Sequence, residues 1–117
     1  MQPINFKCEH NDDEIFEYLS DMLRQNNMSV TGTIDSAMFH NNEDTIKGSL
    51  QRVVASGMSS FVIVADTPIG KIKCDIEHRN DLLQLDVTQR PFFVSRGMIL
   101  KEIKKIIPAD DFFILLD

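Results

Sequence analysis

Cys8 and His10 lie two residues apart near the beginning of the chain, in a segment where apolar and polar residues alternate. This spacing would place both side chains on one face of a β-strand, as a thiolate–imidazole pair for nucleophilic catalysis requires. No third group that could orient the imidazole is identifiable, and the acidic residues nearby would raise the pKa of the thiol. We therefore expect Cys8 to be a buried structural residue and His10 a surface residue.

Two groupings of imidazoles and carboxylates could in principle ligate a metal ion: His10 with Asp12 and Asp13, and Glu77 with His78. Each offers too few ligands, at no recognised metal-site spacing. The segment Ser95-Arg96-Gly97 could hold an anion at a helix N-terminus, but a serine N-cap explains the same residues. The sequence has no GxGxxG, P-loop, HExxH, GxSxG or CxxC motif, so it predicts neither a metal nor another cofactor.

Charge is distributed unevenly along the chain. The 117 residues include 12 Lys and Arg against 18 Asp and Glu, which gives a net charge of −6. Affinity for a phosphate backbone comes from Lys and Arg, so this balance argues against nucleic acid as a direct ligand. Residues 1–60 hold 9 acidic and 4 basic residues, whereas the remainder is nearly neutral with 9 and 8.

The strongest acidic bias falls on a segment that we predict to be a helix over residues 12–25. Ile15, Leu19 and Met22 recur at helical spacing, and Asn11 with Glu14 forms a capping-box pattern at its start. The face opposite these apolar residues carries three carboxylates at four-residue spacing: Asp13, Glu17 and Asp21. Such carboxylates repel one another, and the helix dipole compensates only those in the first turn.

A second acidic surface follows from the register of a predicted hairpin. Residues 60–65, 71–78 and 82–88 should form three consecutive antiparallel strands, the last two joined by a tight turn at Asn80-Asp81. That turn pairs Ile76 with Leu85 and Cys74 with Val87 on the buried face. On the other face it sets Asp75 across from Asp86, and Glu77 across from Gln84. Facing carboxylates are unfavourable, so this is either a solvated sheet surface or a surface that meets a cationic partner.

The remaining segments complete the expected fold: a strand over residues 4–9, a strand over 29–39 with a bulge at Gly32, a helix from the turn at 41–44 to Gly57, a helix over 95–107 capped by Ser95, and a strand over 112–116. The order β-α-β-α-β-β-β-α-β predicts a single α+β domain over residues 1–117. Three helices should pack on a mainly antiparallel sheet of about five to six strands. The chain shows no secretory pattern and no apolar run long enough for a bilayer, so we expect a cytoplasmic protein with free thiols.

These patterns favour a non-catalytic acidic protein that docks and inhibits a basic protein partner. In composition it resembles small cytosolic inhibitors such as immunity proteins and antitoxins, some of which act against toxin nucleases. The expected partner-binding residues are Asp13, Glu17, Asp21, Asp75, Glu77 and Asp86, with no membrane and no direct nucleic-acid ligand. Two alternatives remain: a binding protein resembling type III secretion chaperones, and a small enzyme whose site is assembled from the dispersed residues Cys8, His10, His78 and Arg96.

Overall fold

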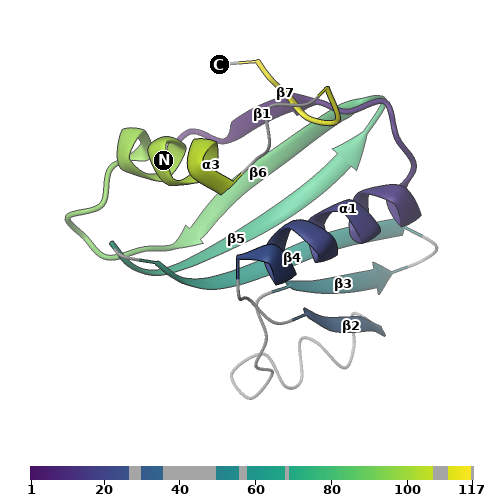
Figure 1. The fold of residues 1–117 in the computed structure, drawn as a ribbon, viewed down its shortest axis with the longest axis horizontal. Coiled ribbons are helices and arrows are strands. Elements are labelled where there is room, and N and C mark those ends of the chain that lie inside the picture. The colour runs from purple at the N-terminus through teal and green to yellow at the C-terminus, as the bar shows by residue number, and fades with distance from the viewer. Residues whose placement is uncertain (27–29, 36–49, 56–57, 68, 107–110, 117) are drawn as a thin grey trace.

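The computed structural model describes residues 1–26, 30–35, 50–55, 58–67, 69–106 and 111–116. Within these residues seven strands form one sheet: β1 (Ile4–Lys7), β2 (Val30–Asp35), β3 (Leu50–Ala55), β4 (Met58–Thr67), β5 (Gly70–Arg79), β6 (Leu82–Gln89) and β7 (Ile114–Leu115). Their spatial order is β2-β3-β4-β5-β6-β1-β7 (Figure 1). The six strands from β3 to β7 in this order are antiparallel, and β2 joins β3 in parallel at the edge.

The same residues contain two helices, α1 (Asp12–Gln25) and α3 (Arg96–Ile106), which lie over one face of the sheet (Figure 1). The chain is therefore α+β with a mainly antiparallel sheet, as the order of the elements predicts. Neither helix of the described segments is long and apolar enough to cross a membrane.

The predicted helix ending at Gly57 is wrong for Leu50–Ala55, which is strand β3. Leu50 is buried in the main core, and Val53 is buried in a small cluster with Val62 and Val64 on the other face of the sheet. A strand that buries apolar residues on both faces does not show a two-residue alternation of apolar and polar residues. For this reason the apolar residues of β3 have a spacing that also fits a helix. The described residues thus hold two helices instead of three, and more strands than expected; residues 41–49 and 56–57 of the predicted helix lie outside the description.

The helix that begins after Asn11 has the predicted boundaries because its start is fixed by a capping box. The Glu14 backbone N–H donates to Asn11 Oδ1 at 2.8 Å, and the Asn11 N–H donates to Glu14 Oε1 at 3.4 Å. At the start of α3 the Met98 N–H donates to Ser95 Oγ at 3.2 Å, which confirms Ser95 as its cap. The strand expected over residues 29–39 is β2, with an irregular register between Val30 and Gly32 and its last four predicted residues outside the description.

The hairpin of β5 and β6 has the predicted register, with Ile76 opposite Leu85, Cys74 opposite Val87 and Asp75 opposite Asp86. Asn80 and Asp81 have φ of 48° and 65°, the left-handed conformation that a two-residue turn of type I′ requires. The strand expected over 112–116 is shorter than predicted, because only Ile114–Leu115 pairs with β1. The main core lies between the sheet and the two helices, with Phe61, Ile4 and Ile15 fully buried.

Candidate functional site

The six carboxylates expected to bind a partner lie on two opposite sides of the molecule. Ile76 and Leu85 face the core under the helices, so the residues that alternate with them along β5 and β6 face away from the helices. This places three of the carboxylates on the sheet face that points away from the helices: Asp75, Glu77 and Asp86. The other three lie on the exposed side of α1: Asp13, Glu17 and Asp21. They cannot form one continuous surface, so each set is a separate candidate interface.

On α1, the three carboxylates differ in how far other residues neutralise them. Asp13 accepts a hydrogen bond from the guanidinium of Arg52, which also donates to Ser59 Oγ at 3.0 Å. Asp21 lies 3.9 Å from the guanidinium of Arg24, an exposed pair. Glu17 is exposed and makes no ion pair within the described segments. Glu17 is therefore the most available negative charge on this face.

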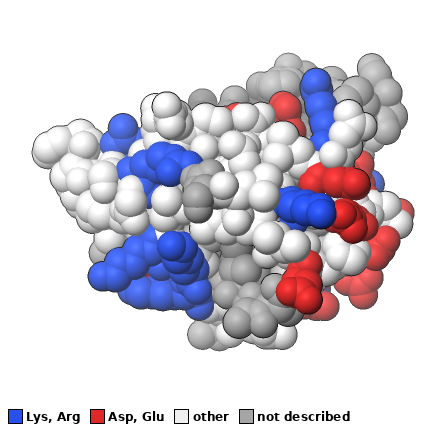
Figure 2. Space-filling model, turned by 90° about the horizontal axis from the view of Figure 1, so that it is seen from above, with Lys and Arg blue, Asp and Glu red and all other residues white. Residues whose placement is uncertain are grey.

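The fold adds a carboxylate that sequence reasoning missed. The Cys8 N–H donates to the backbone oxygen of Asp81 at 2.8 Å, so the β5–β6 turn lies beside the segment that connects β1 to α1. We call this region the acidic end, and it consists of Glu9, Asp12, Asp13, Glu14 and Asp81. Figure 2 shows Asp and Glu gathered toward one end of the molecule, with some Lys and Arg beside them, and a larger group of Lys and Arg toward the other end. The pairing of β1 with β6 brings Asp81 to the acidic end, and the residues next to Asp81 in the sequence do not predict this position.

Cys8 is 1% exposed, which confirms the prediction that it is buried. Burial raises the pKa of its thiol, and the negative charges of Asp81 and Glu14 raise it further. The His78 ring donates from Nε2 to the Cys8 backbone oxygen at 2.9 Å, and its Nδ1 lies 3.4 Å from Asp12 Oδ1. These contacts fasten β5 to the β1–α1 connection. A thiol held neutral in this way is a poor nucleophile.

His10 is half-buried, because its ring is part of a three-ring stack. The His10 and Phe112 centroids are 3.9 Å apart with parallel rings, and Phe112 stacks in the same way on Tyr18, also at 3.9 Å. His10 Nδ1 also lies 3.1 Å from Glu14 Oε2. The stack joins the segment before β7 to α1, a structural role that sequence reasoning did not assign to His10.

Arg96 lies at the other end of β1 from Cys8. Its guanidinium donates to the backbone oxygens of Gln2 at 3.1 Å and Pro3 at 3.0 Å, and so holds the N-terminal segment. The structure therefore brings His78 to Cys8 but does not bring Arg96 to them. In the segments that the structure describes, no group of three or more His, Cys, Asp or Glu residues could hold a metal ion.

The opposite, basic end carries exposed lysines of α3: Lys101, Lys104 and Lys105. The loop that leads into α3 presents two aromatic side chains, Phe92 at 95% exposure and Phe93 at 59%. Their rings pack edge to face on each other, at a centroid distance of 5.6 Å. Charge is thus segregated along the molecule, with an acidic end and a basic end.

No protein-family model matches the chain, and the comparisons with curated proteins and with solved structures give no match either. Its function is therefore argued from its own residues.

Proposed function

We propose that the protein is a non-catalytic binding protein that docks a basic protein partner through its acidic surface and inhibits it, as an immunity protein or antitoxin does. The observation that carries this proposal is the gathering of carboxylates from the β1–α1 connection and the β5–β6 turn at one end of the molecule (Figure 2). A cationic partner relieves the repulsion among them on binding.

Local stabilisation does not account for all of these charges. The first turn of α1 holds Asp12, Asp13 and Glu14, which the positive end of the helix dipole stabilises. Glu17 lies beyond that turn, and Asp81 lies in another element. The type I′ turn accounts for an Asp at position 81, but no cap or turn accounts for Glu17, whose charge adds to the negative potential of a docking surface.

The exposed side of α1 is the surface that we assign to the partner, with Asp13, Glu17 and Asp21 as its contacts. It adjoins the acidic end, so its field adds to that of the cluster. The sheet face that points away from the helices, with Asp75, Glu77 and Asp86, is the second candidate. Charge on such surfaces acts mainly by speeding the encounter, so the association rate is the informative quantity.

The test uses three double charge reversals of matched size. The α1 variant is Glu17→Lys with Asp21→Lys, the sheet variant is Glu77→Lys with Asp86→Lys, and the control is Lys101→Glu with Lys104→Glu on α3. A partner captured by cross-linking in native extract at low salt is identified and purified. Its association rate with each variant is then measured at about 0.05 M and about 0.5 M salt.

We expect the α1 variant to associate about tenfold more slowly at low salt, while the control and the sheet variant keep the rate of the unmodified protein. High salt should reduce the rate of the unmodified protein and largely remove the difference between it and the α1 variant. If only the control variant loses binding, the lysine-rich helix is the interface and the proposal is wrong.

A further inference from the structure

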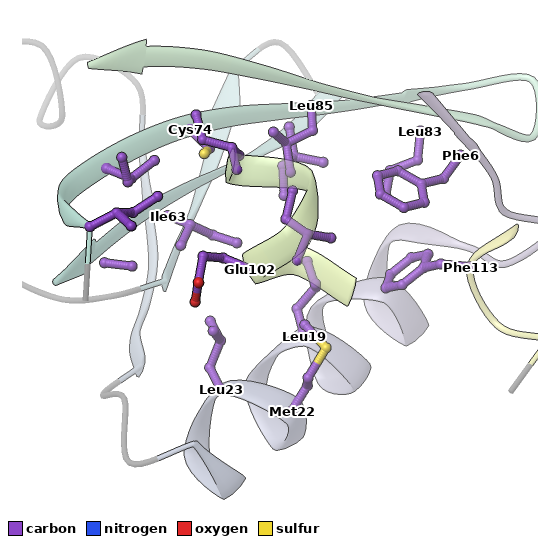
Figure 3. A pocket seen from close by; sticks show the side chains of 16 residues that line it. Phe6, Leu19, Met22, Leu23, Ile63, Cys74, Leu83, Leu85, Glu102 and Phe113 are labelled. Atoms are coloured by element: carbon purple, nitrogen blue, oxygen red, sulfur yellow. The ribbon is translucent and has the colours of Figure 1, made fainter. Parts of the chain in front are cut away.

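A cavity of about 110 Å³ lies between α1, α3 and the sheet. Leu19, Met22 and Leu23 of α1 face it from one side, and α3 bounds it from the other (Figure 3). Its floor is formed by side chains of β4, β5 and β6, including Ile63 and Cys74. The two helices therefore leave a pocket against the main core that is partly open to solvent.

The wall of this cavity is apolar except for Glu102. Apolar walls of this kind accept small apolar molecules of about the size of benzene. The volume is sufficient for one such group.

One charged residue, Glu102 of α3, is among the residues that line the cavity. Figure 3 shows its side chain projecting from α3 toward the space between Ile63 and Leu23. Its carboxylate lies 3.1 Å from Lys105 Nζ, and its side chain is 18% exposed against 60% for Lys105. An ion pair with so exposed a lysine is weak, so another cation can take the place of Lys105.

We propose that this cavity is a binding site for a small apolar amine, whose hydrocarbon part enters the cavity and whose ammonium group pairs with Glu102. The apolar wall accounts for the hydrocarbon part, and the single carboxylate accounts for the sign of the head group. The site is separate from the acidic surface of α1 and does not depend on the function proposed above.

The probes are benzylamine and benzoate, which share a ring but carry opposite charges. Binding is followed by titration into the full chain, with amide chemical shifts of cavity residues as the readout. We expect benzylamine to shift the signals of residues such as Leu23 and Cys74 and to bind about tenfold or more tightly than benzoate. Absence of binding by both probes, or tighter binding of benzoate, would overturn the proposal.

Three variants locate the site. Ala65→Ile places extra carbon atoms in the cavity and should abolish benzylamine binding in a protein that remains folded. Glu102→Gln keeps the shape but removes the charge, and should remove the preference for benzylamine over benzoate. Lys105→Gln frees the carboxylate and should tighten benzylamine binding several-fold. Unchanged affinity in Ala65→Ile, with its fold verified by its amide spectrum, would show that benzylamine binds elsewhere.

Discussion

Filling the cavity should stabilise the protein, and Ala65→Ile is the substitution that the structure favours. Ala65 lies on β4 opposite Ile72 and lines the cavity, so its side chain already points into the empty space. The change adds three carbon atoms, worth about 0.8 kcal/mol each when buried. Ordering the isoleucine side chain costs about 0.5–1 kcal/mol, which leaves a gain of about 1.5 kcal/mol. Unfilled volume costs a protein about 24 cal/mol per Å³, so filling 110 Å³ completely could gain at most about 2.6 kcal/mol. The expected gain from Ala65→Ile lies below this limit.

The measurement is the free energy of unfolding from urea denaturation, with the midpoint of thermal unfolding as a second readout. A gain of about 1.5 kcal/mol corresponds to a rise of about 6 °C in a domain of this size. Val64→Ile is the matched control, because Val64 is the preceding residue of β4 and packs on the other face of the sheet. The control should change stability by less than about 0.5 kcal/mol. If Ala65→Ile instead destabilises the protein by about 1 kcal/mol or more, the space is already filled and the isoleucine is overpacked.

Two further predictions concern buried polar groups. Gln51 is 3% exposed, and within the described segments neither its Oε1 nor its Nε2 has a hydrogen-bond partner. Gln51→Met should therefore raise the free energy of unfolding by about 1–2 kcal/mol. The control in the same denaturation assay is Gln84→Met, because Gln84 is on the same sheet face but only half-buried. A loss of stability in Gln51→Met would show that the Gln51 amide does form hydrogen bonds. Burial raises the pKa of the Cys74 thiol to about 12, so the folded protein keeps a proton that the unfolded chain releases from about pH 8.5 upward. The free energy of unfolding should therefore fall between about pH 9 and 12, and Cys74 should contribute at most about 1.4 kcal/mol per pH unit to this fall. In Cys74→Val the free energy of unfolding should fall less steeply with pH. Equal slopes in the two proteins would show that the Cys74 thiol does not have a raised pKa.

Local signals in the sequence predicted the elements whose boundaries depend on a few neighbouring residues. The capping box defines the start of α1, and the two-residue turn at Asn80-Asp81 sets the register of β5 and β6 by simple counting. The placement of Asp75 opposite Asp86 follows from that register alone. Each of these features is decided within about ten residues of chain, where turn and cap chemistry are specific.

Features that depend on distant segments could not be predicted in this way. Leu50 and Val53 lie on opposite faces of β3, and only the sheet and its two apolar clusters reveal why both are buried. Asp81 joins the acidic end because β6 pairs with β1, which lies far from it in the sequence. The cavity arises from the positions of α1 and α3 over the sheet, and no spacing of apolar residues encodes unfilled space.

The ion pairs at the acidic end explain why this region keeps a negative field although several of its carboxylates have partners. Glu9 and Asp13 pair with Lys7 and Arg52, which carry a full positive charge. Asp12 and Glu14 pair with the imidazoles of His78 and His10, which are charged only when protonated. The full charges of Lys7 and Arg52 offset two of the five carboxylates of the acidic end, so an excess of negative charge remains. The cluster is held rigidly in place and remains electronegative, which is the combination that steers a basic partner to a defined surface.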